Sequence, residues 1–118
     1  MSKDVDFSVL EKHIGDKYSE NSMGCLSPVY LLHPQLPKYD FINNKNYFLP
    51  IVENHCKEKS LQNIEDGDLL MIKVRNEYHF AIFKSPDLIF HCTENSKLRK
   101  SKINIYKKYV VKVYNINL

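Results

Sequence analysis

The chain has 118 residues, of which 43% are hydrophobic and 26% are charged, and its formal net charge is +3. These are the values of an ordinary globular protein, and the length is enough to bury a core without disulfides or metals, so we expect one domain over residues 1–118. The charge is too small to indicate a nucleic-acid partner, and no apolar run approaches the length of a membrane span.

The first segment of the chain predicts a short helix. Apolar residues within 7–14 fall at near-helical spacing, and Asp4 or Asp6 can cap the start of this helix. Gly15 is expected to end it, because glycine is favoured just past the last helical residue.

A second helix is expected to begin close to Cys25. Pro28 is tolerated in a helix only within the first turn, which sets the start of the helix near this cysteine. Pro34 stops the helix, since proline disfavours helical backbone at the residue before it. The segment 47–58 predicts a further helix.

The second half of the chain predicts strands, entered through a turn at Gly67. Apolar residues occupy both faces of the two central strands, which indicates burial on both sides. The sequence therefore predicts an α+β fold, with N-terminal helices packed on a mainly antiparallel sheet of about five strands. The expected strands are 68–74, 78–83, 88–92, 103–106 and 109–116.

The two central strands carry His79 and His91. A hairpin centred on Ser85 makes these histidines direct cross-strand neighbours, with Cβ atoms about 4.5–5.5 Å apart. A centre half a residue later sets Cys92 opposite His79 instead, and a slip of one residue exchanges the two faces of a strand. The pairing of the histidines is therefore a hypothesis that depends on the turn.

A thiol followed in the chain by two imidazoles is the set of groups needed for a cysteine nucleophile. In this hypothesis Cys25 is the nucleophile, and the start of its helix favours the thiolate. His79 is the general base and returns the proton to the leaving amine, while His91 orients His79 and selects its tautomer. Backbone N–H groups at the helix start, such as that of Leu26, are available as oxyanion donors.

Simpler interpretations of the same residues stay open. A single cysteine is usually a small buried apolar residue, and histidines in strands are more often packing residues than catalytic ones. The pairs His55-Cys56 and His91-Cys92 raise a zinc site, but no paired cysteine or histidine spacing supports one, so neither metal nor cofactor is expected. The basic residues within 97–102 are interpreted as a solvated strand or loop edge.

Four segments resemble the NlpC/p60 family of papain-like cell-wall cysteine peptidases. Gly67-Asp68-Leu69 resembles the family's Gly-Asp-Leu strand entry. His79-Phe-Ala-Ile-Phe83 resembles the strand with the catalytic histidine, and Ile89-Phe-His91 the strand with the third polar residue. Ile14-Gly15-Asp-Lys-Tyr18 resembles the segment before the nucleophile. The resemblance extends from about residue 14 to residue 113.

The resemblance implies a papain-like NlpC fold and hydrolysis of amide bonds in bacterial cell-wall peptides through a thioester, with Cys25, His79 and His91 as the triad. It also implies that Tyr18 assists substrate or oxyanion binding. The family's Asp-Cys-Ser-Gly is replaced here by Gly24-Cys25-Leu26-Ser27. This difference motivates a second hypothesis, a degenerate binding module such as a phage tail or assembly component. A CHAP-like amidase also keeps cysteine before histidine.

The cysteines and the N-terminal segment indicate the compartment in which the protein is made. Three cysteines do not form a complete set of disulfides, and residues 1–10 lack the apolar stretch of a signal peptide. We therefore expect a protein made in a reducing cytoplasm. Action on the cell wall would then require another route, such as lysis or a phage particle.

Overall fold

The computed structural model describes residues 5–17, 27–36, 48–75, 77–92 and 97–116. These residues form three α-helices, three short 3-10 helices (η) and six strands. The α-helices are α1 (Ser8–Glu11), α2 (Ser27–Leu32) and α3 (Phe48–His55). The other elements, in chain order, are β1 (Cys56–Lys59), η3 (Leu61–Asn63), β2 (Leu69–Val74), β3 (Glu77–Lys84), β4 (Leu88–Cys92), β5 (Leu98–Lys102), η4 (Ile103–Ile105), η5 (Lys107–Tyr109) and β6 (Val110–Ile116).

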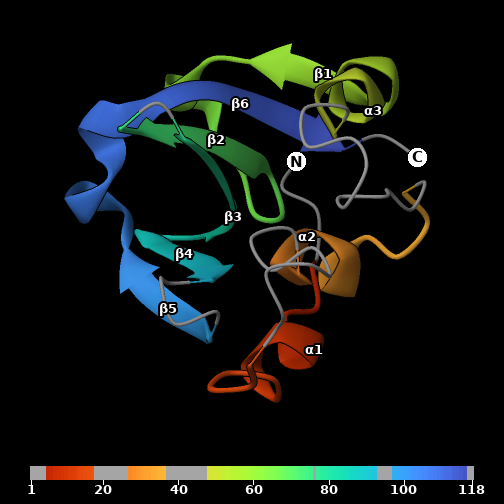
Figure 1. Ribbon diagram of the computed structural model, residues 1–118, viewed down its shortest axis with the longest axis vertical. Coiled ribbons are helices and arrows are strands. Elements are labelled where there is room, and N and C mark those ends of the chain that lie inside the picture. Colours follow the sequence, from red (N-terminus) through yellow and green to blue (C-terminus); the bar gives the residue numbers. More distant parts are fainter. Residues whose placement is uncertain (1–4, 18–26, 37–47, 76, 93–96, 117–118) are drawn as a thin grey trace.

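The strands form one sheet in the order β1-β6-β2-β3-β4-β5, and every neighbouring pair is antiparallel. Figure 1 shows that the sheet is strongly curved, with α1 and α2 on one side and the β5–β6 connection across the other. The predicted α+β class and the antiparallel sheet are confirmed. The described part of the chain has six strands, where about five were expected.

One face of the sheet, the helix-covered face, packs against the three α-helices. Leu10 of α1, Val29 of α2 and Val52 of α3 are fully buried against it. The ring of Phe7 stacks on that of Phe90, with centroids 5.7 Å apart. The strand residues of this face include Leu69, Met71, Phe80, Ile82, Phe90, Cys92, Leu98 and Tyr114.

The opposite face, the concave face, encloses a second apolar cluster. It is formed by alternate strand residues and is closed by Ile103 and Tyr106 from the β5–β6 connection. Apolar side chains lie on both faces of β3 and β4, so the predicted burial of these central strands on both sides is confirmed. The strand residues of this face are Leu70, Ile72, Ala81, Phe83, Ile89 and Val113.

The helices begin where the sequence predicts but are shorter. The N-cap residue of α1 is Phe7, which makes no side-chain cap hydrogen bond, so the prediction that Asp6 caps this helix was wrong. The carboxylate of Asp6 instead accepts the N–H of Ser8, the first helical residue, at 2.9 Å. Turns follow α1 as far as Gly15, where φ is +90°. Pro28 is the second residue of α2, so its predicted place in the first helical turn is confirmed. Asp4 lies outside the described residues.

Two boundaries in the sequence interpretation were wrong. The predicted helix 47–58 ends at His55, and the chain continues directly as β1, because β6 offers this segment a pairing edge. The predicted strand 103–106 is instead η4 and a turn. The basic segment interpreted as a solvated strand or loop edge is the edge strand β5, paired with β4, and its Arg99, Lys100 and Lys102 are exposed. The apolar residues within 103–106 favoured a strand there, but it is the segment 98–102 that pairs with β4 as a strand.

The entry to β2 is the predicted turn at Gly67. Its φ is +86°, a conformation that side chains strongly disfavour, and a Cβ atom there would lie 3.2 Å from Val5 Cγ2. The next residue, Asp68, is 1% exposed, and its carboxylate accepts hydrogen bonds from the Glu65 N–H and the Asn115 side chain. The carboxylate also lies 2.8 Å from Lys59 Nζ, so a single buried group joins the turn to β1 and β6.

Candidate active site

The β3–β4 hairpin brings His79 and His91 to the same face of the sheet, but not as direct neighbours. Ile82 pairs with Phe90 and Lys84 with Leu88, so the turn is centred on Pro86. The predicted centre at Ser85 was therefore wrong, as was the alternative half a residue later, because three residues lie between the last pair. Extending the register sets His91 opposite Ala81, and the histidines become diagonal neighbours on the concave face.

His91 is the more buried histidine of the pair. It is 6% exposed, whereas His79 is half-buried. Burial, together with the nearby His79 and Arg99, lowers the pKa of His91 to about 4. His91 is thus a neutral imidazole at neutral pH, able to donate one hydrogen bond and to accept another.

Two neighbours contact the His91 ring. Its Nε2 lies 2.8 Å from Ser101 Oγ, across the β4–β5 pairing. The ring also meets Tyr106 nearly edge-on, with centroids 5.1 Å apart and planes at 69°. A strand residue and a residue of the β5–β6 connection therefore limit how the imidazole can turn.

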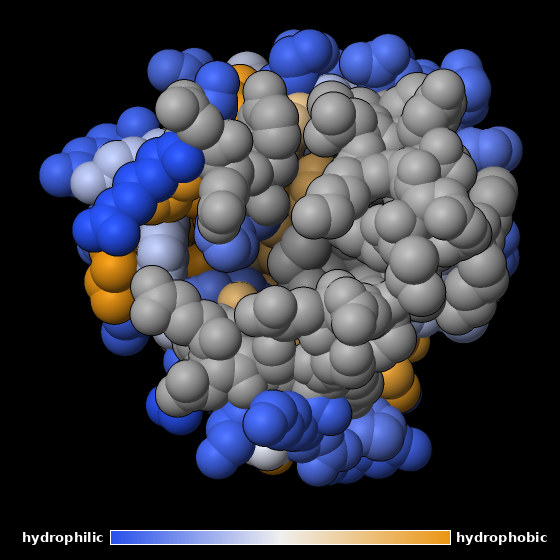
Figure 2. Space-filling model, viewed as in Figure 1, coloured by the Kyte–Doolittle hydropathy of each residue, from blue (hydrophilic) through white to orange (hydrophobic). Residues whose placement is uncertain are grey.

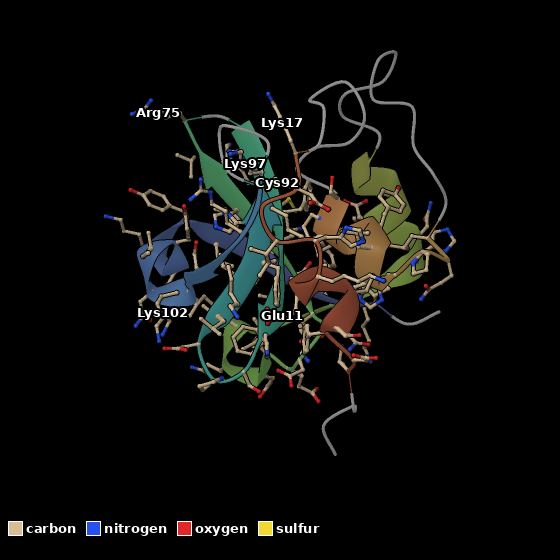
Figure 3. The ribbon with its side chains drawn as sticks, turned by 90° about the horizontal axis from the view of Figure 1, so that it is seen from below. Glu11, Lys17, Arg75, Cys92, Lys97 and Lys102 are labelled. Atoms are coloured by element: carbon tan, nitrogen blue, oxygen red, sulfur yellow. The ribbon has the colours of Figure 1, made fainter. Side chains whose placement is uncertain are left out.

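The start of α2 lies against the end of β4. The side chain of Ser27, the first residue of the helix, is hydrogen-bonded to that of Cys92, the residue after His91. Cys92 belongs to the helix-covered face, whereas His91 belongs to the concave face. In Figure 3, Cys92 lies at the same end of the sheet as Arg75 and Lys97, while Glu11 and Lys102 lie toward the other end.

The other three predicted site residues, Tyr18, Cys25 and Leu26, lie outside the described residues. The described part of the site therefore consists of the histidine pair, with α2 beginning two positions after Cys25 in the chain.

Figure 2 shows the molecule in the same orientation as Figure 1. Apolar surface lies at the left edge of this view, over the β5–β6 connection. Ile105 of this connection is 62% exposed.

The two described cysteines have the character of packing residues. Burial raises the pKa of both Cys56 and Cys92 to about 11, so their thiols stay protonated at neutral pH. Both are free thiols. Within the described ranges, no group of three or more histidine, cysteine, aspartate or glutamate side chains is arranged to hold a metal ion.

Sequence reasoning missed Ser101 and Tyr106. The expected strands did not include 98–102, so the pairing of β5 with β4 that brings Ser101 to His91 was not anticipated. Leu98 is the one apolar residue within 97–102, so no apolar period indicated a strand there. Nothing in the sequence indicated that Tyr106 contacts His91, because the connection to which Tyr106 belongs was predicted as a strand.

The chain matches no family model and no curated protein. In the part of the chain that the structure describes, no helix combines the length and the apolar character needed to cross a membrane.

Proposed function

We propose that this chain is a cysteine hydrolase with a papain-like NlpC fold, which cleaves amide bonds in bacterial cell-wall peptides through Cys25, His79 and His91. The observation that carries the proposal is the histidine pair. A half-buried imidazole and a buried neutral imidazole lie on one face, and the first contributes to lowering the pKa of the second. This difference in environment suits a base that must reach a substrate and a partner that must orient it.

The place where α2 begins supports the same proposal. Ser27 contacts Cys92, the neighbour of His91, and Cys25 precedes Ser27 by two residues in the chain. Two residues of extended backbone span about 7 Å at most. A nucleophile at this point in the chain is thus tethered to the strand end that carries His91.

In the proposed reaction, His79 takes the proton of the Cys25 thiol, and the sulfur attacks the amide carbonyl carbon. Backbone N–H groups, including that of Leu26, stabilise the oxyanion, and Tyr18 assists there. His79 then returns the proton to the leaving amine, which leaves a thioester on Cys25. Water activated by His79 adds to the thioester carbonyl, and the thiol departs as the acid product is released.

The test is cleavage of peptide-bearing cell-wall fragments, followed by chromatography of the released amines. Cys25→Ala should lower turnover at least about a thousandfold and leave the fold intact. His79→Ala should be nearly as damaging, and His91→Ala less so, because orientation is lost while the base remains. The matched control Cys56→Ala should keep wild-type turnover. Undiminished cleavage by Cys25→Ala would overturn the mechanism, and equal total loss in both histidine variants would overturn the assignment of roles.

The second candidate is a non-catalytic binding module on the same fold, such as a phage tail or assembly component. One observation favours it. The Ser27–Cys92 contact lies on the helix-covered face, whereas the histidines lie on the concave face. A thiol-reactive probe at neutral pH separates the candidates. Rapid, selective labelling of Cys25 over Cys56 and Cys92 indicates an activated thiolate, while equally slow labelling of all three favours the binding module.

A further inference from the structure

The contact between His91 and Ser101 joins two different strands. In the β4–β5 register, His91 is opposite Arg99 and Ile89 is opposite Ser101, so the imidazole reaches diagonally to the hydroxyl. The distance from Nε2 to Oγ is 2.8 Å, which is short enough for a well-formed hydrogen bond. His91 is buried, and a buried ring nitrogen without a partner costs free energy, so this bond constrains the ring.

A neutral imidazole carries its proton on one nitrogen only, and a serine hydroxyl can pair with either form. The function proposed above decides between the two forms. When His79 takes a proton, it becomes an imidazolium, and its partner must then accept an N–H from it. If His91 is that partner and its Nε2 is engaged with Ser101, the accepting nitrogen is Nδ1, and the proton of His91 must reside on Nε2.

We propose that Ser101 is a positioning residue, whose hydroxyl oxygen accepts the Nε2–H of His91 and thereby keeps Nδ1 of that ring unprotonated as the acceptor for His79. The catalytic part of this inference rests on the proposed function. The tautomer of His91 does not, because it is a property of the folded chain before any substrate binds.

The neutral character of Ser101 is part of the inference. Burial disfavours a second proton on the His91 ring, as do the nearby His79 and Arg99, and the Tyr106 ring meets it edge-on. A carboxylate at position 101 would oppose them and favour the imidazolium, which donates from both nitrogens and accepts from neither. The Ser101 hydroxyl orients the His91 ring without favouring its imidazolium form.

The experiment is nitrogen NMR of the full chain labelled with ¹⁵N-histidine, at a pH where His91 is neutral. The expected wild-type spectrum has a protonated, pyrrole-type Nε2 and an unprotonated, pyridine-type Nδ1 for His91. Ser101→Thr keeps a hydroxyl and should keep this pattern, whereas Ser101→Ala should move it toward a mixture of tautomers. Ser60→Ala, at an exposed serine bonded to Asn63, is the matched control and should leave His91 unchanged.

Either of two results overturns the inference, namely a wild-type His91 protonated on Nδ1 or an unchanged tautomer in Ser101→Ala. The first needs no variant, so the inference stays testable even if Ser101→Ala fails to fold. A pH titration of Ser101→Asp adds a further check, because the pKa of His91 should rise. An unchanged pKa would contradict direct contact between the two side chains.

Hydrolysis provides the second measurement. In Ser101→Ala, kcat should fall about threefold to tenfold with KM unchanged, and Ser101→Thr should recover most of it, since one hydrogen bond that orients the base is lost. Failure of the proposed function is distinguishable from failure of this inference. If Cys25→Ala cleaves as well as the wild type, the triad is wrong, while the Nε2–H tautomer still supports the role of Ser101 in orienting His91.

Discussion

At the scale of single residues, His91 combines burial, one hydrogen bond to a hydroxyl and one aromatic edge. Such a site stabilises the neutral ring, because an imidazolium there would lose its hydration and lie near other positive groups. His79, half-buried on the same face, keeps access to solvent. The two histidines thus differ in their access to solvent, because they lie at different depths in the fold.

The low pKa of His91, about 4, makes the stability of the fold depend on pH. In the unfolded chain this histidine titrates near its ordinary pKa of about 6.5. Below that pH the unfolded state therefore binds a proton that the folded state does not bind. Stability is therefore fully present above about pH 6.5 and declines as the pH falls toward about 4, by up to about 3 kcal/mol.

Urea unfolding at a series of pH values tests this dependence. His91→Gln should show a shallower decline in the free energy of unfolding between pH 6.5 and 4 than the wild type. His55→Gln, at the end of α3, controls for the loss of a histidine elsewhere. Equal slopes for the wild type and His91→Gln would show that His91 is not the titrating group.

At the scale of elements, the sheet depends on one buried carboxylate at the entry to β2. Asp68 joins Lys59 of β1, the turn before β2 and Asn115 of β6. The resemblance to the Gly-Asp-Leu strand entry is thus accompanied by a structural role for the aspartate, as its position before a strand suggests.

Asp68→Ala should destabilise the fold by about 3 kcal/mol, because it leaves the Glu65 N–H without its acceptor and removes a buried partner of Lys59. Asp87→Ala is the matched control, since Asp87 lies 3.0 Å from Lys102 in an exposed ion pair. Its cost should stay below about 1 kcal/mol. Thermal and urea unfolding measure both, and similar losses in the two variants would contradict a special role for Asp68.

At the scale of the whole molecule, one curved sheet separates two apolar clusters. Leu69 and Leu70 are adjacent in β2 and both 0% exposed, yet the first packs under the helices and the second faces the β5–β6 connection. Because the same strands form the floor of both clusters, we expect the two faces to unfold together.

Leu69→Ala and Leu70→Ala should each lower the free energy of unfolding by about 2–5 kcal/mol, since each leaves a cavity in a closed core. Val111→Ala, at a side chain 51% exposed on β6, should cost far less. Far-UV circular dichroism and tyrosine fluorescence should give coincident urea transitions for all three variants. Two separate transitions would show that the clusters unfold independently.

Much of this architecture follows from local patterns. Segments rich in apolar residues identified β2, β3, β4 and β6 closely, and the prolines placed α2. His79 and His91 share a face because both lie at odd positions of strands joined by a turn of three residues, so the pairing parity keeps them together. The sequence by itself therefore determined the fold class and the central strands, whereas the common side of the histidines depended on the length of the turn.

Tertiary structure decided the rest. The conformation of the turn centred the hairpin on Pro86 and made the histidines diagonal, and pairing with β4 made a strand of the basic segment 98–102. That pairing also set Ser101 against His91, a contact between residues ten positions apart on different strands. Local propensities act over a few residues, whereas strand register and edge pairing depend on contacts that exist only once the chain has folded.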